Sequence, residues 1–284
     1  MFFLSAEVAH EKGHYDCPHF QKFLDQFQTI FTCHDIFKNN TKFSLPFLGW
    51  MINANHGPSM FAKSDRDINW FKKNHHIDKP KNLSVFCSAK QLMPDHKLRF
   101  KFVKALKEHF GDKLDWYGNG VEPLAEKWDG IAPYKYHIVL ENQSRNNIIT
   151  EKLYDSFLAL AYPIYCGAPN VGDYFKIDSL TQIDMMDLNG AIEKIELILK
   201  DDVWESKLPL LIESKMRVLN DYNVFNRIAE IAKANEDLFP SKVKQPITLV
   251  ASQNFRPFFS IKTMLHLIGK IMRRISAKMI LFSQ

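Results

Sequence analysis

The sequence predicts an α/β fold organised around a parallel sheet. Short apolar runs suited to buried strands alternate with stretches in which apolar residues recur at helical spacing. The clearest unit covers residues 133–175, where a strand at 136–140, a polar loop, a helix from Thr150 and a strand at 163–166 follow one another. Two strands joined through a helix are normally parallel, with a right-handed crossover. Ligands of such sheets bind beyond the carboxyl ends of the strands, so we expect a binding site there.

The amino-terminal part of the chain predicts a smaller set of elements. In order, they are a strand at residues 2–4, a helix at 17–27, a strand at 29–32, a short helix at 65–73 and a linker at 75–81. We therefore divide the chain into an amino-terminal domain at 1–78, a larger domain at 79–240 and a basic tail at 241–284.

The larger domain repeats the alternation of strand and helix. A strand is predicted at 83–88, a helix at 98–110 that ends at Gly111, a further strand at 114–117, and helices at 188–199, 210–219 and 224–232. Pro209 is placed at the start of the helix at 210–219, because proline is well tolerated in a first helical turn. These helices have the spacing needed to cover a sheet.

The helix start at Thr150 is the first candidate binding feature. Unpaired backbone amides and the positive end of the helix dipole favour an anion, and Lys152 in the first turn adds a full positive charge. A phosphate group would suit this position, with Glu151 accepting hydrogen bonds from a sugar hydroxyl. The alternative is a solvated helix start of mixed charge, and spacing alone favours that alternative.

Three motifs that follow one another along the chain favour the phosphate site over the solvated helix start. The runs YKYHIVLEN, ITEK and YPIYCGAPN resemble the donor-binding signature of the glycosyltransferase family 10 fucosyltransferases, the α-1,3/4-fucosyltransferase-like enzymes. The matching positions are Tyr134, Lys135, Glu141, Asn142, Thr150, Glu151, Lys152, Pro163, Gly167 and Pro169. Ile148 replaces an aromatic residue of the pattern, Cys166 stands where tryptophan is frequent, and Ala89 stands where asparagine is common.

The resemblance implies a GT-B architecture with two Rossmann-like domains, of which the amino-terminal one is abbreviated. The implied reaction is transfer of L-fucose from GDP-fucose to a hydroxyl of a glycan acceptor of the lipopolysaccharide or capsule type, with inversion and without a metal or other cofactor. It also leads us to expect that the usual amino-terminal part is missing, because the acid that matches the family's general base is the seventh residue.

The resemblance assigns roles to individual residues. Glu7 matches the general base, while Ser88, Arg99, Asn142, Glu151 and Lys152 match donor-binding positions, and Glu141, Ile148 and Lys90 are further donor-side candidates. Arg99 would hold diphosphate oxygens through its guanidinium group. Without the resemblance, we would interpret Glu7 as an exposed loop residue and Arg99 as a surface arginine on an amphipathic helix.

Charge is unevenly distributed along the chain. The net charge is +5, yet residues 241–284 contain eight Lys or Arg and no acid, so the remainder is slightly acidic. Apolar residues at 260–284 recur at helical spacing, which predicts an interfacial membrane helix. The alternative is a helix that packs on the amino-terminal domain or on a partner. We expect a cytoplasmic protein with peripheral contact at the inner face of the membrane, and no nucleic-acid partner.

Other patterns are weaker. The four cysteines form no C-x-x-C pair, which favours free thiols in a reducing compartment, and no run reaches the roughly 20 apolar residues that span a bilayer. The D-x-D triplet at 65–67 and the adjacent His75 and His76 lack the context of a metal site. Two other classes remain open. One is a degenerate homologue that binds nucleotide or glycan without turnover, and the other is a basic protein that binds membranes or nucleic acid.

Overall fold

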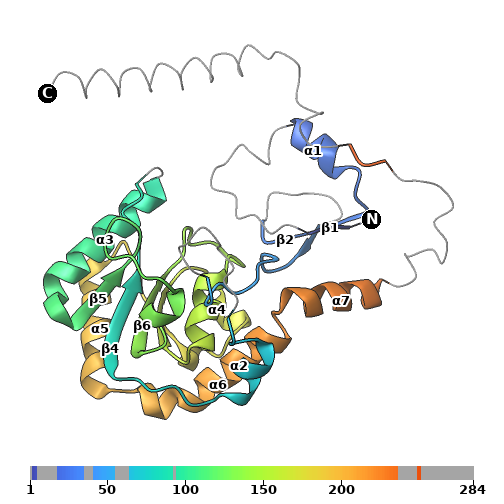
Figure 1. Ribbon diagram of the computed structural model, residues 1–284. Coiled ribbons are helices and arrows are strands. Elements are labelled where there is room, and N and C mark those ends of the chain that lie inside the picture. The colour runs from blue at the N-terminus through green and yellow to red at the C-terminus, as the bar shows by residue number, and fades with distance from the viewer. Residues whose placement is uncertain are drawn as a thin grey trace, which may run out of the picture.

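The computed structural model describes residues 2–4, 18–34, 41–54, 64–91, 94–235 and 248–250. These residues form two separate parallel sheets (Figure 1). The small sheet has the order β1-β2-β3, with β1 at Phe2–Leu4, β2 at Thr29–Thr32 and β3 at Thr41–Phe43. The large sheet has the order β5-β4-β6-β7-β8. The predicted α/β class with parallel sheets is therefore confirmed.

The strands of the large sheet pair only in parallel. They are β4 at Lys81–Phe86, β5 at Leu114–Tyr117, β6 at Tyr134–Leu140, β7 at Tyr162–Cys166 and β8 at Thr181–Gln182. Every residue of β7, and every residue of β6 except Lys135, is buried. Strands covered on both faces are expected to be continuously apolar, which is why this pair was the most visible in the sequence.

Helices cover both faces of the large sheet (Figure 1). The described helices of this part of the chain are α2 at Ile68–Lys73, α3 at Pro94–Phe110, α4 at Glu151–Leu158, α5 at Leu188–Asp201, α6 at Trp204–Asn220 and α7 at Val224–Ala234. Of these, α2 packs on α6, and α7 extends away from the sheet in Figure 1, while α1 at Pro18–Leu24 accompanies the small sheet. An ion pair between His109 and Glu196 joins α3 to α5, while α4 packs on α6. Short 3-10 turns lie at Gly111–Lys113, Lys127–Gly130, Val171–Asp173 and Ile177–Ser179.

The predicted start of the helix at 210–219 is wrong. Helix α6 begins at Trp204, and Pro209 lies inside it. The backbone N–H of Trp204 donates to the Tyr136 hydroxyl at 3.1 Å, and its indole N–H donates to the Leu160 carbonyl at 2.8 Å. These tertiary contacts fix the helix start. Helix α6 therefore tolerates the loss of the one intrahelical hydrogen bond that Pro209, which has no backbone N–H, cannot make. The short strands β3 and β8 were not predicted.

The segment between the two sheets packs on the large one. Leu45, Ile52 and Phe71 belong to the same hydrophobic core as the large sheet. The predicted linker at 75–81 is also anchored, because Lys79 Nζ donates to the carbonyls of Ala132 and Ala159 at 2.7 and 2.6 Å. Much of residues 44–80 is thus attached to the larger unit, and the boundary at 78/79 stays a prediction.

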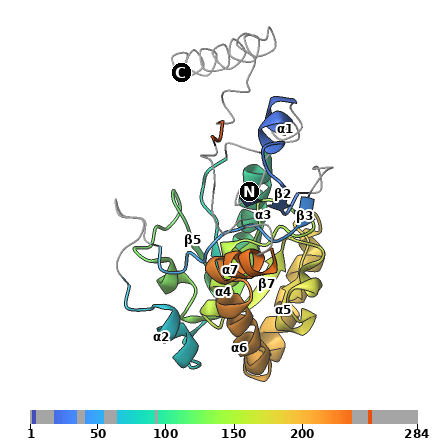
Figure 2. The ribbon, with the colours of Figure 1, turned by 90° about the vertical axis from the view of Figure 1, so that its right-hand side faces the viewer.

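Helix α7 connects the larger unit to the segment that follows the small sheet. Figure 2 shows α7 in front of α4, with β2 and β3 above it. The Arg227 side chain donates to the carbonyls of Leu45 and Pro46 at 2.7 and 3.0 Å, and to the Ser44 hydroxyl. One buried guanidinium group therefore ties α7 to the chain directly after β3.

Two sequence predictions fall outside the described residues. They are the general base Glu7 and the amphipathic segment at 260–284. Within the described part of the chain, no helix is long and apolar enough to cross a membrane. Cys33, Cys87 and Cys166 are buried and free.

Candidate functional site

Glu141 organises the carboxyl end of β6. Its side chain is buried, and its two oxygens accept hydrogen bonds from the backbone N–H and the hydroxyl of Thr150 at 2.8 and 2.7 Å. Thr150 is the N-cap of α4, and its hydroxyl oxygen accepts from the Lys152 backbone N–H. The carboxylate at the end of the strand therefore fixes where the helix starts. Glu141 is 1% exposed, so it presents almost no surface to a ligand.

Lys152 and Glu151 form the partly exposed part of this helix start. Lys152 Nζ lies 2.9 Å from Glu151 Oε1 and 3.5 Å from Glu141 Oε2. Burial opposes ionisation of Lys152, but the two carboxylates outweigh it and raise the pKa of Lys152. Burial likewise opposes ionisation of Glu151, yet the positive charges of Lys152 and Lys127 lower the pKa of Glu151 to about 2. Both side chains are therefore charged at neutral pH.

Arg99 on α3 is the second cation near this helix start. Its positive charge counteracts part of the rise in the pKa of Lys152, so the two cations share one electrostatic environment. The Nε atom of Arg99 is buried and has no hydrogen-bond partner among the described residues. A buried donor without a partner costs free energy. Two neighbouring cations, one of them with an unused donor, are suited to an anion such as a diphosphate.

The loops beyond β6 and β7 are locked to each other. The Ser144 hydroxyl donates to the Gly167 carbonyl at 2.8 Å, and the backbone N–H of Asn147 donates to Asn170 Oδ1 at 2.8 Å. The Tyr174 hydroxyl donates to Asn147 Oδ1 at 2.5 Å. These hydrogen bonds connect the two loops that form the edge of the site.

Lys127 is a site residue that the sequence reasoning missed. It lines a cavity of about 100 Å³ together with His137, Glu151 and Lys152. Its Nζ lies 2.6 Å from Oδ2 of the fully buried Asp155. A single lysine at the start of a 3-10 turn carries no sequence signal, because its placement depends on a tertiary contact with α4.

The structure gathers most of the predicted donor-side residues at one edge of the sheet. The register that pairs Val85 with Ile138 brings Ser88 level with Glu141, and Asn142 follows directly. The side chains of Ser88 and Asn142 have no hydrogen-bond partner in the part of the chain that the structure describes, and Lys90 is exposed. Ile148, in contrast, is 1% exposed and contributes to the protein interior rather than to an open donor surface.

Two matching positions of the signature lie at the opposite end of β6. Tyr134 donates to Asp115 Oδ2 at 2.5 Å, and Lys135 Nζ lies 2.5 Å from Asp202 Oδ2. Both residues begin the strand, whereas Glu141 follows its carboxyl end. Their hydrogen bonds therefore stabilise the amino end of the sheet and do not reach the candidate site.

The larger unit is similar to known proteins. Residues 78–201 match the family model described as glycosyltransferase family 10 (fucosyltransferase), C-terminal part. Among solved structures, an alpha1,3-fucosyltransferase with GDP-fucose is similar at 16% identity and a TM-score of 0.49, covering 73% of this chain and 65% of that chain. TarM is similar at 9% identity and a TM-score of 0.49, covering 82% of this chain and 49% of that chain. The present chain thus spans slightly less than two thirds of the first of these structures.

The matched region extends from the strand β4 to the end of α5 and contains every described candidate residue, from Ser88 to Lys152. The resemblance carried by the three motifs is thereby confirmed. Over residues 78–201, this chain is therefore similar to glycosyltransferase family 10, the fucosyltransferases.

Proposed function

We propose that this protein is an inverting, metal-independent glycosyltransferase that moves L-fucose from GDP-fucose to a hydroxyl of a glycan acceptor. The observation that carries the proposal is that two cations, Arg99 and Lys152, share one electrostatic environment at the start of α4. The buried Nε of Arg99 also has no hydrogen-bond partner among the described residues. The family match of residues 78–201 supports the nature of the donor.

In the proposed mechanism, the cluster binds the donor through its diphosphate. Arg99 and Lys152 donate to the phosphate oxygens, and the amino end of α4 adds its dipole. As the bond from the sugar to the diphosphate breaks, negative charge grows on the leaving group, and fixed cations stabilise that charge. Glu151, ionised because its pKa is about 2, accepts hydrogen bonds from hydroxyls of ribose or fucose, and Asn142 orients the same groups.

The acceptor side of the proposal rests on the sequence. Glu7, outside the described residues, removes the proton from the acceptor hydroxyl as the general base. The acceptor is a precursor of lipopolysaccharide or capsule type, met at the inner face of the membrane through residues 260–284.

The test measures GDP binding by calorimetry and transfer of radiolabelled fucose from GDP-fucose to a glycan acceptor. We expect Lys152→Ala to reduce transfer at least about 100-fold, because a cation opposite the leaving group contributes about 3 kcal/mol or more to the transition state. Lys152→Arg should retain part of the activity. Lys233→Ala removes an exposed lysine of α7 that makes no contact with the site, and serves as the matched control.

Folding of Lys152→Ala must be checked by circular dichroism, since the lysine also neutralises two carboxylates. Full transfer activity in a folded Lys152→Ala variant would contradict the proposal.

A homologue that binds the nucleotide without turnover is the second candidate. It is favoured by the burial of Ile148 at a position where the family pattern carries an aromatic residue. GDP binding that is lost in Lys152→Ala, with no fucose transfer by the unmodified protein to any glycan acceptor, would select this candidate.

A further inference from the structure

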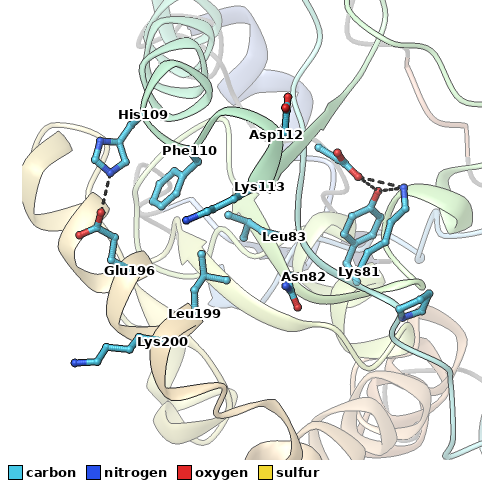
Figure 3. A pocket seen from close by; sticks show the side chains of 13 residues that line it. Lys81, Asn82, Leu83, His109, Phe110, Asp112, Lys113, Glu196, Leu199 and Lys200 are labelled. Carbon is cyan, nitrogen blue, oxygen red and sulfur yellow. Dashed lines mark hydrogen bonds and ion pairs between the residues drawn. The ribbon is translucent and has the colours of Figure 1, made fainter.

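A second cavity lies at the end of the large sheet opposite to the candidate donor site. Its volume is about 840 Å³, and residues at the amino ends of β4, β5 and β6 line it. The C-terminal ends of α3 and α5 form its other walls (Figure 3). The volume lies within the range of roughly 300–1,000 Å³ that is typical of small-molecule sites.

Two of the carboxylates in the wall of this cavity already have side-chain partners. Glu196 Oε1 lies 2.8 Å from His109 Nε2, which connects α5 to α3 at one side. At the other side, Asp115 Oδ2 accepts from the Tyr134 hydroxyl at 2.5 Å and from Lys81 Nζ at 3.1 Å. Figure 3 shows both pairs as dashed lines at opposite sides of the cavity. Both carboxylates are therefore engaged by side chains of the protein itself.

Of the lining cations without such a partner, Lys200 points away from the cavity in Figure 3, which leaves Lys113. It makes no hydrogen bond or ion pair with the residues that the structure describes, and Figure 3 shows it extending across the cavity between Phe110 and Leu199. Asp112 next to it points away from the cavity in the same view. A lysine at this position would ordinarily bind the last carbonyls of α3. Here Lys107 binds carbonyls that follow α3, donating to those of Gly111 and Leu114 at 2.9 and 2.8 Å.

The surface below Lys113 is apolar. Leu83 and Phe110 are 1% and 7% exposed, and Leu199 of α5 completes this surface. A positive charge above an apolar surface matches a molecule with an apolar body and one anionic group, because each part then meets a complementary environment.

We propose that this cavity binds an amphipathic anion, with its apolar body against Leu83, Phe110 and Leu199 and its carboxylate or phosphate group on Lys113. The site is separate from the donor site, because the two occupy opposite ends of the parallel strands. Its ligand does not compete with GDP.

The proposal is tested by isothermal titration of the full chain with four compounds that share an octyl chain. They are nonanoate, octyl phosphate, octanol and octyltrimethylammonium. We expect at least one of the two anions to bind about tenfold more tightly than octanol, because a charge-assisted hydrogen bond contributes about 1.5–3 kcal/mol. The cation should not bind measurably. Which anion binds more tightly identifies the head group.

The variant Lys113→Gln should lose about tenfold in affinity for the anion and retain the affinity for octanol. Lys233→Gln removes the same charge from exposed α7 and should leave all affinities unchanged. Saturating GDP should not alter anion binding. The proposal is overturned if neither anion binds, if the cation binds equally well, if Lys113→Gln matches the unmodified protein, or if GDP displaces the anion.

Discussion

His137 and Asp155 are buried near the candidate site and have opposite pKa shifts. Burial, with the nearby charges of Lys127 and Lys79, lowers the pKa of His137 to about 3. Burial also raises the pKa of Asp155 to about 6, although Lys127 opposes this. The Ser84 hydroxyl lies 2.8 Å from His137 Nδ1 and satisfies that ring atom. At neutral pH the histidine is therefore uncharged and the aspartate is largely ionised.

The shift of His137 predicts a loss of stability in acid. Below its unfolded pKa of 6.5 the unfolded chain binds a proton, whereas the folded chain does so only near pH 3. The free energy of unfolding thus falls by about 1.4 kcal/mol per pH unit within that window. Urea denaturation at pH 6, 5 and 4 should show His137→Gln gaining stability relative to the unmodified protein as the pH falls. A constant difference between the two would contradict the prediction.

The pKa shift of Asp155 predicts the opposite dependence of stability on pH. Its folded pKa of about 6 exceeds the unfolded value of 3.8, so the folded state binds the extra proton and stability rises on acidification between these values. Asp155→Asn should consequently lose stability relative to the unmodified protein from pH 6 to 4, by about 1.4 kcal/mol per unit. Asparagine keeps an acceptor for the Met51 backbone N–H, which bonds Asp155 Oδ1 at 2.8 Å. A relative gain in stability would contradict this assignment.

At the scale of elements, the start of α4 depends on one hydroxyl. Thr150→Ala removes the N-cap acceptor and leaves one buried oxygen of Glu141 without its partner. The cap contributes about 1 kcal/mol and the unpaired oxygen about 1–3 kcal/mol, so we expect a loss of about 2–4 kcal/mol in the free energy of unfolding. Chemical denaturation measures this loss.

Thr150→Ser is the matched variant, since it keeps the hydroxyl and removes only a methyl group. It should lose less than about 1 kcal/mol. Equal losses in the two variants would show that packing, and not the cap, holds the helix start. Because Lys152 is positioned by the same turn, Thr150→Ala should also weaken GDP binding, whereas Thr150→Ser should not.

The elements that could be predicted from the sequence are those whose burial is continuous. Strands β6 and β7, with the helix α4 between them, follow from apolar runs and helical spacing. In contrast, β3 and β8 have three and two residues, too few for a pattern to show. The start of α6 depends on the contact of Trp204 with Tyr136, which no local rule contains.

The candidate site was predictable to a similar extent. The motif placed Glu151 and Lys152 at a helix start, because N-terminal signals are local. It could not indicate that the Glu141 carboxylate accepts hydrogen bonds from Thr150, or that Ile148 is buried. Both features depend on how the loop folds back over the strand. Lys127 joins the site through Asp155 of α4, so only the tertiary structure reveals it.

For the molecule as a whole, Arg227 is the main polar contact between α7 and the chain after the small sheet. Its guanidinium group is 8% exposed, donates to Leu45, Pro46 and Ser44, and lies 4.1 Å from the ring centroid of Phe47. A planar group with several donors can satisfy these acceptors together, which a lysine ammonium cannot do with the same geometry. The position of the segment at 44–47 on the larger unit therefore depends on one side chain.

Arg227→Ala should release this segment without unfolding the large sheet. Two buried carbonyls would lose their donor, which predicts a loss of about 2–4 kcal/mol in the free energy of unfolding. Hydrogen exchange should accelerate at residues 41–47, including the Ser44 amide that donates to the Thr32 carbonyl at 2.9 Å, and remain slow in β6. Arg227→Lys keeps the charge and should show an intermediate effect. Unchanged exchange at 41–47 in Arg227→Ala would mean that the apolar contacts of Leu45 and Phe47 hold the segment by themselves.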